Sequence, residues 1–189
     1  MNLYKTIIVY IMLCFFISHD VNAQQDTTPF RNTSWGMTLE EVKKVDPDIE
    51  YYEPLNENQS YDLRYYEKED VLLGLKVMVR YGFFHNKLLQ GQYQTTSIDT
   101  TLESALDKYE KFKNALVEKY GEPIKKDVEW PTYLSERASS WSTPKSYIIL
   151  ELYSLFTIAY SAKIIYMDKD WVENQNKYKS EKQEIKDKF

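Results

Sequence analysis

The sequence predicts an α+β fold in which two halves, each a helix followed by antiparallel strands, form one sheet with the helices packed on one face. Three observations favour this fold. Two segments begin with capping-box residues and continue with apolar positions at helical spacing. Each is followed by runs in which apolar and polar residues alternate, as in strands with one buried face. At 189 residues, the chain is long enough for one such domain and short for two.

The first 23 residues have the pattern of a secretory signal peptide. Lys5 precedes an apolar run from Ile7 to Ile17, and the segment ends in small-compatible residues before a cleavage point between Ala23 and Gln24. The run is too short to span a bilayer, which takes about 20 apolar residues. We therefore expect export to the periplasm or the extracellular space and a soluble product after cleavage, with an uncleaved anchor as the alternative.

One domain is predicted over residues 30–166, after a flexible polar leader at 24–29. Two half-repeats, 30–96 and 97–166, are indicated because each begins with a capped helix and ends in a long hairpin. Residues 167–189 contain many charged and few apolar side chains, which predicts a charged tail that is helical or disordered.

The first half begins with a short helix. Thr38 and Glu41 form its capping box, and Pro47 ends it. A short strand is expected at residues 50–53, and apolar–polar alternation resumes at 61–66.

A long hairpin over residues 71–95 is the central element, preceded by a charged turn at 68–70. In its first arm the alternate residues that should face the core are Leu73, Leu75, Val77, Val79 and Tyr81. His85 and Asn86 should form the polar turn. In the second arm, Leu88 and the glutamines should point away from the face that holds Leu89, Gly91 and Tyr93.

The second half begins with the strongest helical pattern in the chain. Thr100 and Glu103 form a capping box, Gly121 is the expected C-cap, and Pro123 prevents continuation. The apolar stripe of this helix comprises Leu102, Ala105, Leu106, Tyr109, Phe112, Leu116, Val117 and Tyr120. Strands are then predicted at residues 124–130, 139–143, 147–153 and 156–163.

The sheet face that the helices leave open is the candidate binding surface. Its predicted side chains are Arg64, Tyr66, Lys76, Met78, Arg80, Gln90, Gln92, Tyr147, Glu151 and Tyr153. Tyrosine, arginine and methionine are favoured in the cores of protein interfaces. An ordinary solvated sheet face has much the same composition, and that alternative stays open.

The composition argues against several kinds of chemistry. Cleavage would remove Cys14 and His19, which leaves His85 as the sole histidine and no cysteine. We therefore predict no catalytic residue, no metal site and no cofactor, although Asp168 and Asp170 make weak calcium binding conceivable. The 24 basic and 29 acidic residues include no basic cluster, which argues against nucleic-acid binding. No glycines have the spacing of a nucleotide loop.

Four short motifs carry a family resemblance. They are F-R-N-T-x-W-G-M-T at Phe30–Thr38, E-E-V-K-K at Glu40–Lys44, N-K-L-x-x-G-x-Y at Asn86–Tyr93 and K-Y-G-E-P at Lys119–Pro123. The succession resembles small exported bacterial domains of uncharacterised function. The order of helices and strands is similar, at fold level, to β-lactamase-inhibitor-protein-like domains and to small lipoproteins that assist outer-membrane β-barrel assembly. The resemblance implies binding of a protein or peptide on an open sheet face, without catalysis. The residue before Cys14 is not the small one that lipid attachment requires, so membrane anchoring is not implied.

Two functions follow from these patterns. The first is a non-enzymatic, exported binding or envelope-assembly module for a cell-envelope protein or peptide, with no nucleic-acid partner and no membrane span after cleavage. The second is a small carbohydrate-binding or carbohydrate-active protein that uses tyrosine, tryptophan and carboxylates. Glu151 lies inside a predicted strand and should point outward from it. A cleft with two carboxylates within about 10 Å would favour the second function.

Overall fold

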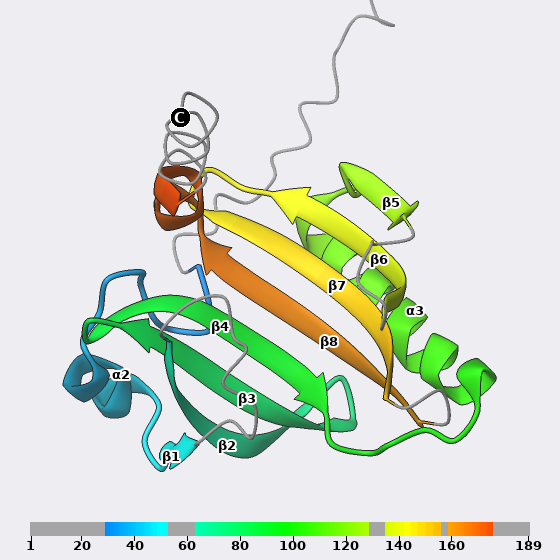
Figure 1. The fold of residues 1–189 in the computed structure, drawn as a ribbon, viewed down its shortest axis with the longest axis horizontal. Coiled ribbons are helices and arrows are strands. Elements are labelled where there is room, and N and C mark those ends of the chain that lie inside the picture. The colour runs from blue at the N-terminus through cyan, green and yellow to red at the C-terminus, as the bar shows by residue number, and fades with distance from the viewer. Residues whose placement is uncertain (1–28, 53–62, 129–134, 156–158, 176–189) are drawn as a thin grey trace, which may run out of the picture.

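The structure of the chain, a computed structural model, describes residues 29–52, 63–128, 135–155 and 159–175 (Figure 1). The predicted signal peptide and most of the leader lie outside these residues, as does the tail beyond residue 175. A helical segment over residues 169–175 follows the last strand. The other elements are α2 (Leu39–Val45), β1 (Glu50–Tyr52), β2 (Arg64–Leu72), β3 (Leu75–Phe84), β4 (Lys87–Thr95), α3 (Leu102–Tyr120), β5 (Lys125–Val128), β6 (Ser135–Ser142), β7 (Ser146–Leu155) and β8 (Ala159–Asp168).

The strands form a single antiparallel sheet in the order β1-β2-β3-β4-β8-β7-β6-β5. The first half contributes α2 with β1 to β4, and the second half contributes α3 with β5 to β8. The halves meet where β4 pairs with β8, so the first strand of each half, β1 or β5, forms an edge of the sheet. The predicted α+β fold, with two helix-plus-strand halves in one sheet, is confirmed.

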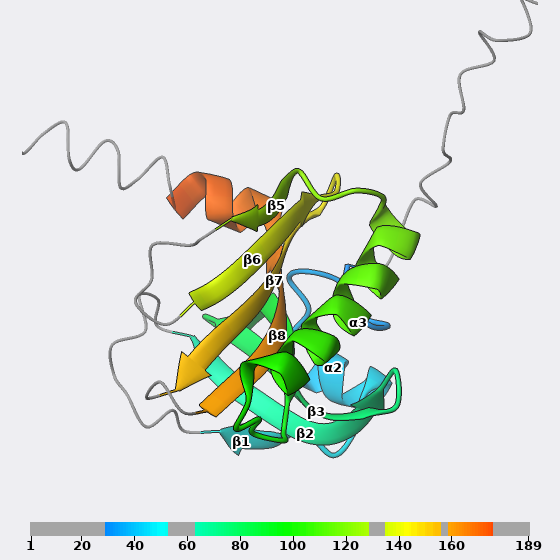
Figure 2. The same cartoon turned by 90° about the vertical axis from the view of Figure 1, so that its right-hand side faces the viewer.

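Helix α3 lies across β7 and β8 (Figure 2). Its N-cap is Thr101, whose hydroxyl accepts a hydrogen bond from the backbone N–H of Ser104. The N-cap is therefore one residue later than the predicted Thr100. Gly121 ends the helix as predicted, with a φ of 80° that a residue without Cβ adopts readily. For α2, the predicted capping box is present in full.

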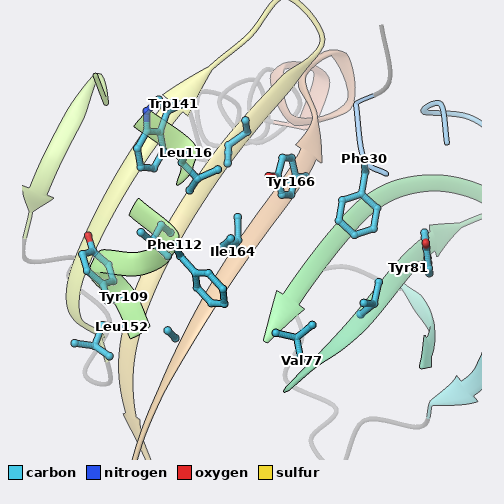
Figure 3. Packing of buried hydrophobic residues seen from close by; sticks show 14 of the residues in the cluster. Phe30, Val77, Tyr81, Tyr109, Phe112, Leu116, Trp141, Leu152, Ile164 and Tyr166 are labelled. Atoms are coloured by element: carbon cyan, nitrogen blue, oxygen red, sulfur yellow. The ribbon is translucent and has the colours of Figure 1, made fainter. Parts of the chain in front are cut away.

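The core lies between the helices and one face of the sheet (Figure 3). Val77, Val79 and Tyr81 of β3 are completely buried, as the alternation predicted. From α3 the buried apolar side chains are Ala105, Tyr109, Phe112 and Leu116. Burial of a large apolar side chain contributes about 1.5–3 kcal/mol, so these residues are the main source of cohesion between helix and sheet. No helix among the described residues is long and apolar enough to cross a membrane.

The charged turn predicted at residues 68–70 is wrong. These residues lie within β2, and the β2–β3 hairpin turns at Leu73 and Gly74, which have φ angles of 52° and 74°. Leu73 is therefore an exposed turn residue and not part of the core. Lys68 and Asp70 point to the helix-facing side of the sheet, where they form ion pairs with Asp46 and Arg31.

The predicted turn at His85 and Asn86 is present, with φ angles of 48° and 60°. A shift of register between Gly82 and Phe83 places Leu88 opposite Phe83 and in the core. The prediction that Leu88 points outward is therefore wrong, because the irregularity interrupts the strict alternation of strand residues.

The remaining strands are found with shifted ends. The strand expected at residues 50–53 is β1, and those expected at 139–143 and 147–153 are the longer β6 and β7. Strand β8 continues to Asp168, so it extends two residues past the predicted end of the domain. Residues 129–130 and 156–158 of the other two predicted strands lie outside the described residues.

Candidate functional site

The sheet face opposite α2 and α3, called the outer face below, holds most of the predicted site residues. Antiparallel partners that lie directly opposite each other share a face. Arg80 on β3 lies opposite Glu67 on β2 and Gln92 on β4, so these three side chains share the outer face. By the same pairing the outer face also holds Lys76, Met78, Gln90, Tyr147, Glu151 and Tyr153.

Arg64 and Tyr66 lie on the helix-facing side, which corrects the prediction. The register of β2 and β3 places Tyr66 opposite Tyr81, a core residue. Tyr65 and Glu67 therefore occupy the outer face. The residue types could not show which side chains of β2 face the core, because Tyr65 and Tyr66 are adjacent and either could do so. The position of the β2–β3 turn determines which residues of β2 face the core, and the sequence pattern predicted that turn too early in the chain.

A hollow of about 150 Å³ lies on the outer face across the join of the two halves. Such a volume holds several water molecules or one group the size of a side chain. Its lining residues come from β1, β2, β3, β4 and β8, and they are Tyr52, Tyr65, Arg80, Gln92, Gln94 and Lys163. The sequence singled out Arg80 and Gln92 and missed the others. Gln94 continues the alternation of the predicted glutamines, a signal that could have identified it.

Arg80 is the most constrained side chain of the hollow. Its Nε donates to Oε2 of Glu67 at 2.5 Å, and its Nη1 donates to Oε1 of Gln94 at 2.6 Å. The guanidinium carbon lies 4.5 Å from the ring centroid of Tyr52, within cation–π range. The side chain is 17% exposed. Contacts with three neighbours fix the orientation of the guanidinium before any ligand arrives.

Lys163 is the second cation of the lining. Its Nζ lies 3.1 Å from Oε2 of Glu151 and 5.1 Å from the ring centroid of Tyr153. The amide nitrogen of Gln94 donates to the hydroxyl of Tyr153 at 2.5 Å. Hydrogen bonds and ring contacts thus connect Lys163 to Arg80 through β4.

Gln92 and Tyr65 complete the polar lining. Gln92 is 8% exposed, and within the described part of the chain its amide has no hydrogen-bond partner. The hydroxyl of Tyr65 donates to Oε1 of Gln90 at 3.0 Å. Burial raises the pKa of Tyr65 to about 12, so this phenol is protonated at neutral pH.

The charged residues that line the hollow are all cations. Its lining contains the cations Arg80 and Lys163 and, among the described residues, no carboxylate. Their partners Glu67 and Glu151 lie on β2 and β7, outside the lining. The hollow therefore presents amide groups and two cations, each of which is paired with a carboxylate outside the lining.

His85 and Asp168, which were considered from the sequence for catalysis and for calcium binding, make local contacts within the chain. His85 is exposed at its turn and stacks on Phe84, with 4.1 Å between ring centroids. Oδ1 of Asp168 accepts from the backbone N–H of Asp170 at 3.1 Å, where the helical segment 169–175 begins. Nowhere in the described ranges do three His, Cys, Asp or Glu side chains cluster closely enough to hold a metal ion.

Comparison with protein-family models, with curated proteins and with solved structures finds no match for this chain. The family resemblance read from the four motifs stays a prediction. The function is therefore argued from the chemistry of the outer face alone.

Proposed function

We propose that the protein is a non-enzymatic binding module that holds a protein or peptide partner on its outer face. The hollow around Arg80 is the observation that carries this proposal. It is a polar recess on the sheet face that neither α2 nor α3 covers, and its main cation is already oriented by Glu67, Gln94 and Tyr52. Side chains held in place before binding lose little conformational freedom when a partner arrives, which favours affinity.

The surroundings of the hollow support a macromolecular partner. Met78, Tyr147 and Tyr153 are half-buried on the same face, together with Ile149 and Ile165. Tyrosine, arginine and methionine are enriched in the cores of protein interfaces. The outer face therefore combines a polar recess with apolar and aromatic surface on which the rest of a polypeptide can pack.

The carboxylates next to the hollow do not favour a carbohydrate-active enzyme there. A glycosidase needs two carboxyl groups about 5–10 Å apart that flank the bound sugar. Glu50 on β1 lies directly opposite Glu67 on β2, but Glu67 is bonded to Arg80, and no described residue that lines the hollow is a carboxylate.

The arrangement of aromatic rings also argues against sugar binding at the hollow. The guanidinium of Arg80 covers the ring of Tyr52, where a sugar would otherwise stack. Trp141 lies in the core, 3% exposed, and its ring N–H donates to the backbone carbonyl of Gly121 at 2.8 Å.

We place this function in the periplasm or the extracellular space because the first 23 residues have the pattern of a cleaved signal peptide. Mass spectrometry of the protein from its own cells tests the location. The expected mature chain begins at Gln24, whereas a chain that retains Met1 in the cytoplasm would contradict it.

Photo-crosslinking in intact cells tests the binding face. A benzophenone amino acid placed at Met78 should yield an adduct with one discrete partner. The matched control positions are Lys44 on α2 and Asp107 on α3, which are exposed on the helical side and should give no adduct. Adducts from the helical positions, or none from the outer face, would contradict the proposal.

A further inference from the structure

The hollow contains hydrogen-bond donors that the protein itself leaves unused. Arg80 engages Nε and Nη1, and within the described part of the chain its Nη2 has no partner. The amide of Gln92 is likewise without a partner there, although only 8% of the residue is exposed. The unpaired atoms of both side chains are open to solvent at the hollow, so a ligand can reach them. These donors therefore point to a ligand with acceptor oxygens.

The charges specify the ligand further. Arg80 and Lys163 both line the hollow, from β3 and β8, while their carboxylate partners lie outside the lining. An anion can therefore meet both cations without replacing Glu67 or Glu151. Charge-assisted hydrogen bonds of this kind are about twice as strong as neutral ones.

We infer that the hollow is the subsite for an acidic side chain, glutamate or aspartate, of the bound polypeptide. The inference rests on the proposed function and names the chemistry that the partner must present. The carboxylate would accept from Nη2 of Arg80, from the amide of Gln92 and from Nζ of Lys163. A volume of about 150 Å³ suits one such side chain, and the surrounding outer face takes the rest of the peptide.

A pair of tripeptides tests the subsite directly. The probe is acetyl-Gly-Glu-Gly-amide, and its matched control is acetyl-Gly-Gln-Gly-amide, which has the same shape without the charge. The measurement is an NMR titration that follows the side-chain N–H signals of Arg80, Gln92 and Gln94. The glutamate peptide should shift these signals saturably and the glutamine peptide should not, and added salt should weaken the binding.

Variants of the protein locate the contact. Arg80→Gln and Lys163→Gln should each weaken binding of the glutamate peptide about tenfold, because each removes a charged hydrogen bond. Gln92→Leu should weaken it less, because it removes a neutral donor. Lys76→Gln is the matched control, since Lys76 lies on the outer face but not in the lining. The backbone amide spectrum of each variant verifies its fold, and Lys163→Gln suffices if Arg80→Gln does not fold.

Three results would overturn the inference. They are equal shifts with the glutamine peptide, equal weakening by Lys76→Gln, and inorganic phosphate that shifts the same signals at lower concentration than the peptide. If the glutamate peptide fails while crosslinks form at Met78, the acidic subsite is wrong and the binding face stands. If the peptide binds but no outer-face crosslink forms, the proposed function is wrong and the anion subsite stands.

Discussion

The ring of Phe30 lies directly on Gly91, so that a Cβ at Gly91 would stand 2.3 Å from the ring carbons. Gly91 lies opposite Tyr81 on β3 and Tyr166 on β8. The ring of Phe30 is 5.3 Å from that of Tyr81 and 5.4 Å from that of Tyr166, as the close-up of the core illustrates (Figure 3). Because Gly91 has no side chain, the ring of Phe30 can pack on β4, and the segment around Phe30 is held where the two halves of the sheet meet.

Gly91→Ala should destabilise the protein by about 1–3 kcal/mol, because the added methyl group displaces a buried ring. Urea unfolding of the two proteins measures the difference. In a Phe30→Ala background the same substitution should cost much less, since no ring remains to be displaced. An equal cost in both backgrounds would show that the backbone, and not Phe30, requires glycine.

Asp46 should be the most sensitive carboxylate among the described residues. It is 6% exposed, it accepts the hydroxyl proton of Tyr81, and it pairs with Lys68 and, at 3.0 Å, with Arg31. Asp46→Ala should cost about 2–3 kcal/mol in thermal or urea unfolding, because it removes the acceptor of the buried Tyr81 hydroxyl together with the ion pairs to Lys68 and Arg31. Asp70→Ala also removes a partner of Arg31, but at a more exposed position, and should cost under about 1 kcal/mol. Similar losses for both variants would contradict this ranking.

The fold was predictable from the sequence wherever periodicity alone decides. Val77, Val79 and Tyr81 alternate with polar residues, and their burial follows from that pattern. The predictions failed where one residue shifts the register. The irregular pairing beside Gly82 turns Leu88 inward, and the glycine inside the strand is the only local sign of it.

The candidate site was predictable only in part for a related reason. Alternation placed Arg80 and Gln92 on the outer face, but Tyr52 and Lys163 reach the same hollow from strands that are distant in the sequence. Their proximity depends on the pairing of β4 with β8, a long-range contact that no local pattern contains. Whether Tyr65 or its neighbour faces outward likewise depends on where the chain turns.

Stability should fall as the pH rises from about 10 to about 12. Burial raises the pKa of Tyr65 to about 12 and that of Tyr166 well above the ordinary value of 10. The folded state therefore holds these phenol protons more tightly than the unfolded state, and this stabilisation is complete below about pH 10. It is lost as the pH rises through the folded pKa.

Urea unfolding at several pH values between about 9 and 12 measures this loss. Tyr65→Phe removes one of the titrating groups, so its free energy of unfolding should decline less steeply over that interval than that of the unmodified protein. Parallel declines in the two proteins would show that the ionisation of Tyr65 is not linked to folding.

Tyr66→Ala should destabilise the domain, although the sequence alone placed this tyrosine on the binding face. Its ring lies 5.7 Å from that of Phe83 and 5.6 Å from that of Tyr51, and it packs against the core. Loss of these contacts from a half-buried position should cost about 2 kcal/mol in urea unfolding. Lys76→Ala, at an exposed position on the outer face, should change stability by less than about 0.5 kcal/mol. A neutral Tyr66→Ala variant that no longer forms crosslinks from Met78 would instead place Tyr66 at the partner interface and contradict the register of β2 described above.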